Sequence, residues 1–341
     1  MAVPRSLSSA PGHGGGTAVC GPRRRLITAA VLGAGMAGTQ GWAQERRVPL
    51  VGVLAASGLS SLDSLRQGMA AQGYVEGQSI RYAFRSADGN PRDLPGLARH
   101  LVSLNVEVLF CAGPAAVDAA VHASSQVKIV ALDLETDPLR SGLVKSLEHP
   151  RTNVTGVFLD QPALTARWLE LLRQAAPQAK RLNLLWDAGS GPWQLAAAKT
   201  AATASGFDID TLVVRNEAEF ERELIDGMAT KPEVLLLLSS PLVRARSVQL
   251  AEFARKHRLP ALSAFSEFPQ AGGLMSYGPN VPSLYLRAAI FVDQVLRGSR
   301  AGDLPIAVPG RFELVLNQRT ATALGLGLPQ ALRAAASELI Q

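Results

Sequence analysis

Cysteine, histidine and aromatic residues are all scarce in this 341-residue sequence. It contains 2 cysteines, Cys20 and Cys111, 5 histidines and only 5% aromatic residues. Cys20 lies in an N-terminal leader, so the mature chain keeps Cys111 alone and can form no intramolecular disulfide. The histidines are scattered, and no spacing typical of metal ligands occurs. We therefore expect no metal site and a fold stabilised by apolar cores.

Motifs of catalysis are also missing. The sequence holds no G-x-S-x-G elbow, P-loop, H-E-x-x-H or C-x-x-C. "GAGMAG" (33–38) fits the dinucleotide fingerprint G-x-G-x-x-G, but no helix of useful length follows it. Gly58 also stands where an acidic residue would hold the ribose. We therefore expect no cofactor, no catalytic residue and no enzymatic activity.

The first 43 residues have the features of a secretory leader. Arg23, Arg24 and Arg25 precede the apolar run "LITAAVLGAGMAG", which ends at the small residues Gly41 and Ala43. The stretch "RRRL" resembles a twin-arginine signal, and the general secretory route is compatible with it too. We expect cleavage near Ala43 and a periplasmic mature protein.

Without this leader the chain is nearly neutral. Lys and Arg number 34 and Asp and Glu 28, giving +6, but the leader holds four arginines and no acid, which leaves 30 against 28. Such a balance does not indicate a nucleic-acid partner. Beyond the leader, apolar runs such as "VLLLL" are far shorter than the ~20 residues of a membrane span. The mature sequence therefore predicts no span.

From Val48 onward, short apolar runs alternate with segments of helical periodicity. "VPLVGVLAAS", "KIVALD", "RLNLLWD" and "EVLLLLSS" are typical of buried strands, whereas "PAAVDAAVHA", "ALTARWLELLRQAA" and "PLVRARSVQLAEFARKH" are each typical of one helix. Strands buried on both faces and separated by helices predict a parallel sheet covered on both sides. The pattern restarts after "NVTGVFLD". It predicts an α/β protein with two doubly wound parallel-sheet lobes and a ligand cleft between them.

Residues that directly follow the expected strands are the candidates for ligand binding, because ligands of open α/β sheets lie outside the carboxyl ends of the strands. Three joins, "CAGPAAV", "GSGPWQL" and "LSSPLVR", place proline in the first turn of a helix, whose N-terminus can bind a carboxylate. Such residues are equally ordinary caps and turns. The candidates are Ser57, Ser60, Ser61, Gly113, Pro114, Asp133, Asp187, Ser239, Ser240, Ser263, Phe265, Glu267 and Tyr277.

Two of these candidates are acidic residues at the ends of strongly apolar strands. Asp133 and Asp187 would be costly there unless their carboxylates accept hydrogen bonds. A neighbouring helix cap or the ammonium group of a ligand would supply them, and both interpretations remain open. Likewise, Phe265 and Tyr277 are either walls of the cleft or members of the core.

Six segments give the chain a family resemblance. They are "GYVEGQSI", "DPLRSGLVKSLEHPRTNVTGV", "RWLELLRQAAPQAKRLNLLWD", "FARKHRLPALSAF", "EFPQAGGLMSYGPN" and "DLPIAVPGRFELVLNQRTATALGLGLP". Together they resemble the ABC transporter substrate-binding family that includes tryptophan/tyrosine-binding proteins. The resemblance implies a type 1 periplasmic-binding-protein fold, crossing segments between the lobes, and one small ligand, an amino acid or other small carboxylate. It also implies delivery to a membrane permease served by a separate ATPase.

This resemblance suggests a division of the chain. We expect the leader in residues 1–43, the first lobe in 48–155, the second in 156–278, and crossover segments in 279–341 that return to the first lobe and complete both. We expect a monomer. Two other functions remain open for such a chain: an enzyme that uses Asp or Glu, and a ligand-sensing regulatory protein. The regulator would carry a DNA-binding helix-turn-helix instead of a leader.

Replacing Arg23, Arg24 and Arg25 together with lysine tests the export route. A receptor reads the twin arginines themselves, so lysines of the same charge should leave uncleaved precursor in the cytoplasm. Cell fractionation followed by immunoblotting would measure this. Normal export of the triple variant would assign the chain to the general secretory route.

Overall fold

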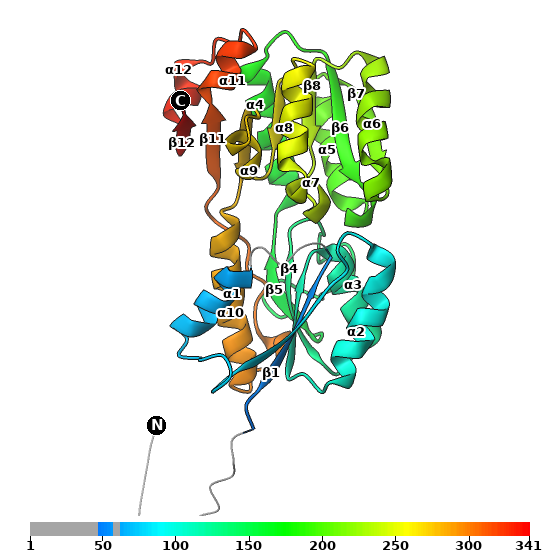
Figure 1. The fold of residues 1–341 in the computed structure, drawn as a ribbon, viewed down its shortest axis with the longest axis vertical. Coiled ribbons are helices and arrows are strands. Elements are labelled where there is room, and N and C mark those ends of the chain that lie inside the picture. Colours follow the sequence, from blue (N-terminus) through cyan, green and yellow to red (C-terminus); the bar gives the residue numbers. More distant parts are fainter. Residues whose placement is uncertain (1–46, 57–61) are drawn as a thin grey trace, which may run out of the picture. The chain divides into compact units, whose positions relative to one another are not determined.

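Two sheets of mainly parallel strands organise residues 47–341 (Figure 1). The computed structural model describes residues 47–56 and 62–341. The predicted leader, its predicted cleavage site and the glycine fingerprint lie outside these residues, as do Ser57, Ser60 and Ser61.

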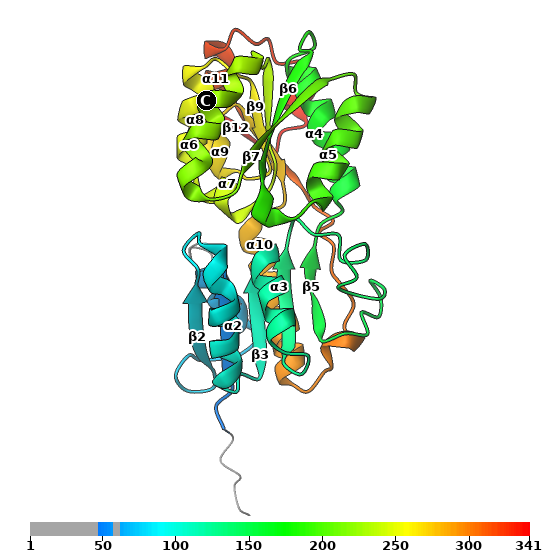
Figure 2. The same ribbon diagram turned by 90° about the vertical axis from the view of Figure 1, so that its right-hand side faces the viewer.

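The first lobe contains a five-stranded parallel sheet in the order β2-β1-β3-β4-β5. Its strands are β1 (Leu50–Ala55), β2 (Arg81–Ser86), β3 (Val108–Ala112), β4 (Lys128–Asp133) and β5 (Val154–Phe158). The helices α1 (Leu62–Ala71), α2 (Leu94–Ser103) and α3 (Pro114–Ala123) connect them. Helices α2 and α3 lie over one face of this sheet, and α1 lies over the other (Figures 1 and 2). Because both faces are covered, the central strands β1 and β3 are apolar throughout, and β4 is apolar between Lys128 and Asp133 at its two ends.

The second lobe contains a seven-stranded sheet in the order β12-β11-β10-β9-β8-β6-β7. Its strands are β6 (Arg181–Asp187), β7 (Asp208–Val214), β8 (Val234–Leu237), β9 (Ala261–Ser263), β10 (Met275–Gly278), β11 (Glu313–Asn317) and β12 (Glu338–Ile340). Its helices are α4 (Gln161–Ala175), α5 (Trp193–Ala204), α6 (Phe220–Asp226), α7 (Pro241–Ala245), α8 (Ser247–Lys256), α9 (Glu267–Gln270), α11 (Gln318–Ala323) and α12 (Gln330–Ala334). All its strand pairs are parallel except β10 with β11. The expected fold of two doubly wound α/β lobes is confirmed.

The chain passes between the lobes three times. It crosses from β5 to α4, from β10 to α10 (Val281–Leu296), and from α10 to β11. Helix α10 packs against α1 and against β3, β4 and β5, so it belongs to the first lobe although it follows strands of the second (Figure 1). The third crossing runs beside β5, where the Ala307 N–H donates to the Gly156 carbonyl at 2.8 Å.

One segment differs from its predicted structure. "PLVRARSVQLAEFARKH" has continuous helical periodicity, yet it forms two helices, α7 and α8, that meet at Arg246. The Ser247 hydroxyl donates to the Arg244 carbonyl at 2.8 Å and so competes with the helical backbone pattern at this point. The break leaves α7 as a short turn of helix that ends beside the space between the lobes.

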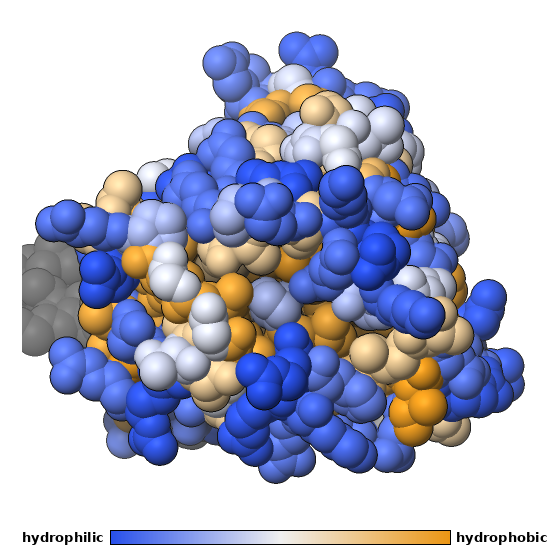
Figure 3. Space-filling model, turned by 90° about the horizontal axis from the view of Figure 1, so that it is seen from above, coloured by the Kyte–Doolittle hydropathy of each residue, from blue (hydrophilic) through white to orange (hydrophobic). Residues whose placement is uncertain are grey.

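Polar side chains dominate the surface seen from above, and apolar ones are scattered between them in small groups (Figure 3). Single exposed apolar residues such as Val248 and Ile225 are normal for a folded protein. Among the described residues, no helix has both the length and the apolar character needed to cross a membrane.

The Gly156→Ala variant should be strongly destabilised. Gly156 has φ +138°, and a Cβ there would lie 2.0 Å from the Ala131 carbonyl oxygen on the neighbouring strand. Backbone strain and overpacking together should lower the free energy of unfolding by about 2–6 kcal/mol, as measured by urea denaturation.

Gly96→Ala is the matched control for that measurement. Gly96 lies in helix α2 and has nothing within 4 Å of the added methyl group. This variant should gain about 0.5–1 kcal/mol. Equal stability of the two variants would contradict the close approach of β4 and β5.

Candidate functional site

A cavity of about 230 Å³ lies between the two lobes, at the carboxyl ends of their strands. The first lobe contributes Ala112, Gly113, Leu132, Leu134 and Glu135, together with Val281 and Tyr285 of α10. The second lobe contributes Pro241, Arg244, Ala245, Phe265 and Glu267. The walls are mainly apolar, and a few charged groups converge on them. Such a composition is typical of small-molecule sites.

Glu135 is the buried acid of this cavity, and it joins the two lobes. Its side chain is 2% exposed, and its Oε1 accepts a hydrogen bond of 2.6 Å from the Ser239 hydroxyl, which follows β8 in the other lobe. Gln194 of α5 orients Ser239 by donating to its carbonyl at 2.9 Å and accepting from its N–H. The contact between the lobes therefore includes a buried polar network.

Three acidic residues lie at or near this contact: Glu135 itself, Asp133 and Asp187. Burial and the charges of Asp133 and Asp187 raise the pKa of Glu135 to about 8, against a smaller lowering by the Ser239 hydrogen bond. Burial also raises the pKa of Asp133 and of Asp187. In the described part of the chain, none of the three acids forms an ion pair. The region is thus short of positive charge.

Asp133 and Asp187 both accept hydrogen bonds from the backbone that follows them. The Asp133 Oδ1 accepts from the N–H groups of Glu135 at 3.0 Å and Thr136 at 2.9 Å. The Asp187 Oδ1 accepts from the Gly189 N–H at 2.8 Å and caps a 3₁₀ turn. Neither residue lines the cavity. These hydrogen bonds show that both aspartates cap the backbone that follows them. Binding of a ligand's ammonium group by either aspartate stays a prediction.

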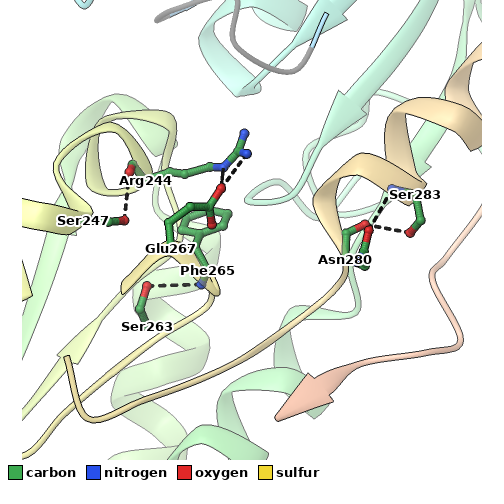
Figure 4. A network of polar contacts seen from close by, with 7 residues as sticks. All are labelled: Arg244, Ser247, Ser263, Phe265, Glu267, Asn280 and Ser283. Atoms are coloured by element: carbon green, nitrogen blue, oxygen red, sulfur yellow. Dashed lines mark hydrogen bonds and ion pairs between the residues drawn. The ribbon is translucent and has the colours of Figure 1, made fainter. Parts of the chain in front are cut away.

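An ion pair forms the opposite wall (Figure 4). The Arg244 guanidinium of α7 donates to the Glu267 Oε1 of α9 through Nε at 2.9 Å and Nη2 at 2.6 Å. Its carbon lies 5.9 Å from the centroid of the buried Phe265 ring. Nearby, the Asn280 side chain caps α10 by accepting from the Ser283 N–H at 3.0 Å. This cap starts the helix that carries Val281 and Tyr285 into the cavity.

Seven other candidates predicted from the sequence either lie at the cavity or support local structure. Gly113, Phe265 and Glu267 line the cavity, and Ser239 is bonded to Glu135. Three others support local structure: Ser240 caps α7, Ser263 accepts from the Phe265 N–H, and Pro114 starts α3.

Tyr277 lies elsewhere. It lines a separate pocket of about 250 Å³ beside the crossings and stacks on Phe312, with ring centroids 5.7 Å apart. Its carbonyl accepts from the Trp168 Nε1 at 2.6 Å. Its side chain is not among those that line the cavity.

Glu135, Arg244 and Tyr285 line the cavity although they are not among the candidates predicted from the sequence. Glu135 lies only two residues beyond the end of β4, in "LDLETDP", and a second acid inside an apolar stretch was a usable signal. Arg244 lies one turn into α7, beyond the residues that directly follow the strand. Tyr285 belongs to α10, and no local pattern in the sequence indicates that α10 returns to the first lobe.

The Glu135→Gln variant should reduce the pH dependence of stability. The folded protein raises the pKa of Glu135 from 4.5 to about 8, so its protonated form is favoured by folding. This contribution to stability is complete below pH 4.5 and is lost as the pH rises towards 8. The thermal midpoint of the ligand-free wild type should fall across this range, and that of the variant should fall less. Parallel curves for the two proteins would contradict a buried, protonated Glu135.

Comparison with known proteins places the chain in a family. Residues 51–340 match the family model of the ABC transporter substrate binding protein. A tyrosine-binding protein from Clostridioides difficile is 24% identical over 272 residues, which cover 78% of each chain.

Two solved structures share the fold at TM-score 0.79, and each covers 86% of this chain. One is a conserved domain protein from Vibrio cholerae, 26% identical over 100% of its own length. The other is an ABC domain from Streptococcus pneumoniae in complex with L-Trp, 21% identical over 99% of its length. With a family match over nearly the whole described chain, the protein belongs to the ABC transporter substrate-binding protein family.

Proposed function

We propose that this protein is the exported solute-binding component of an ABC importer and captures an amino acid with an aromatic side chain. The observation that carries the proposal is the cavity between the lobes, which combines apolar and aromatic walls with a buried acid and an arginine. The tyrosine and L-Trp ligands of two relatives support this class of ligand. Proteins of this family are binding proteins rather than enzymes, which favours capture over catalysis.

The cavity favours one orientation of such a ligand. The ammonium group would lie at Glu135, because this acid lines the cavity whereas Asp133 and Asp187 stand outside it. The carboxylate would lie towards Arg244, whose charge is shared with Glu267. The aromatic side chain would pack between Phe265 and Tyr285, where stacked or edge-to-face contacts are favourable.

The biological setting follows from the family and from the leader. We expect the mature protein to be a periplasmic monomer that hands its ligand to a permease driven by a separate ATPase. An enzyme on this fold would convert the ligand, so mass spectrometry of the ligand after incubation separates the two functions. A regulatory protein would remain in the cytoplasm, and cell fractionation distinguishes it.

Titration calorimetry with L-tryptophan and L-tyrosine tests the proposal. We expect wild type to bind at least one of them, and Glu135→Gln to bind it more weakly because the variant keeps the size of the side chain and loses its charge. The loss should be about 1.5–3 kcal/mol, roughly 10- to 150-fold in Kd, as for hydrogen bonds to charged groups.

Glu252→Gln is the control for the loss of one negative charge. Glu252 is exposed on α8, away from the cavity, so this variant should bind as wild type does. Undiminished binding by folded Glu135→Gln would contradict the position assigned to the ammonium group. Absence of binding by wild type would exclude these two ligands, and native mass spectrometry would then show what the purified protein retains.

A further inference from the structure

A second pocket, of about 600 Å³, lies between the lobes and is lined by residues of α3 and by Trp193 of α5. Figure 2 shows the two helices, one in each lobe. It shares no lining residue with the cavity that contains Glu135. Leu94, Val117 and Leu143 of the first lobe form apolar walls, and Trp193 of α5 faces them from the second lobe. Helix α3 and the 3₁₀ turn Ala188–Ser190 are in contact here.

Two residues that line this pocket each carry a buried polar atom that has no hydrogen-bond partner among the described residues. These atoms are Oδ2 of Asp133, a residue that is 0% exposed, and Oγ of Ser190, which is 1% exposed. The other carboxylate oxygen of Asp133 accepts two backbone hydrogen bonds, which fix the orientation of the group. Buried polar groups are almost always paired, so two unpaired atoms on residues that line one pocket point to a missing partner.

The acidic Asp133 and the apolar walls of the pocket indicate which chemical groups the missing partner carries. Asp133 has no cation within ion-pairing distance in the described part of the chain. Burial raises the pKa of its carboxyl group, because the charged form is poorly solvated there. The Asp118 carboxylate at the pocket already faces His122 at 3.4 Å. The Arg140 guanidinium lies 5.6 Å from the centroid of the Trp193 ring, so this aromatic side chain already accommodates one cation. An ammonium group supplies three donors and the missing positive charge.

We propose that this pocket is a second ligand site, for a primary amine with an apolar body, whose ammonium group donates to Asp133 Oδ2 and Ser190 Oγ. Asp133 belongs to the first lobe and Ser190 to the second, so the amine bridges the lobes. A ligand held by both lobes stabilises the arrangement that brings them together. The site does not depend on the proposed function, because the two cavities have separate linings.

Calorimetry of the mature protein with 2-phenylethylamine tests the site, with 2-phenylethanol as the uncharged ligand of similar shape. We expect saturable binding of the amine and at least about 10-fold weaker binding of the alcohol, since only the amine pairs with the carboxylate. Asp133→Asn should weaken amine binding by about 10-fold or more, and Ser190→Ala by about 3- to 10-fold.

Two further measurements separate this site from the alternatives. The Ser190 hydroxyl makes no hydrogen bond in the described structure, so Ser190→Ala should keep or raise the thermal midpoint while it loses amine affinity. Phe265→Leu alters the cavity that contains Glu135. This variant should bind the amine within about twofold of wild type, while any affinity for L-tryptophan or L-tyrosine falls.

Four results would overturn the proposal: no saturable binding of the amine, equal binding of the alcohol, unchanged amine affinity in folded Ser190→Ala, or loss of amine binding in Phe265→Leu. None of them bears on whether the cavity of Glu135 binds an amino acid. That question is answered by the amino-acid titrations of wild type.

Discussion

The buried hydrogen bond between Glu135 and Ser239 is the contact on which the arrangement of the site depends. It joins the end of β4 in one lobe to the end of β8 in the other, and Gln194 holds Ser239 in place. A parallel sheet brings the carboxyl ends of its strands to one edge, and here two such edges face each other. Because the bond is buried and satisfied on both sides, it favours one register of the two lobes over neighbouring ones. The cavities on either side of it take their shape from that register.

The contact also brings three acidic side chains close together. Glu135, Asp133 and Asp187 lie close enough for their charges to interact, and none forms an ion pair in the described structure. Arg244, which lines the cavity, has part of its charge neutralised by Glu267. Buried carboxylates of this kind either keep their protons or receive a positive charge from a ligand. A ligand with an ammonium group would supply the positive charge that the folded chain lacks at this contact.

Helix α10 and the crossings couple the lobes to this site. The helix starts at the Asn280 cap, places Val281 and Tyr285 in the cavity, and packs on α1 and on three strands of the first lobe. The chain then returns beside β5 before it completes the second sheet. Any movement of one lobe against the other would therefore change the backbone angles in these few short crossing segments, as in hinge closure around a ligand. The stacked aromatic pair Tyr277 and Phe312 lies at these segments.

The sequence by itself determined the two-lobed α/β fold, since apolar runs such as "KIVALD" and "RLNLLWD" coincide with β4 and β6 and depend only on local patterning. It also indicated the edge at which Gly113, Phe265 and Glu267 line the cavity, because strand ends of a parallel sheet share one edge. Periodicity could not show that α7 and α8 separate, or that α10 belongs to the first lobe. Only the tertiary structure decided which side chains meet across the lobes. Glu135 reaches Ser239, 104 residues away, and the pairing of such distant side chains depends on the packing of whole lobes rather than on neighbouring residues.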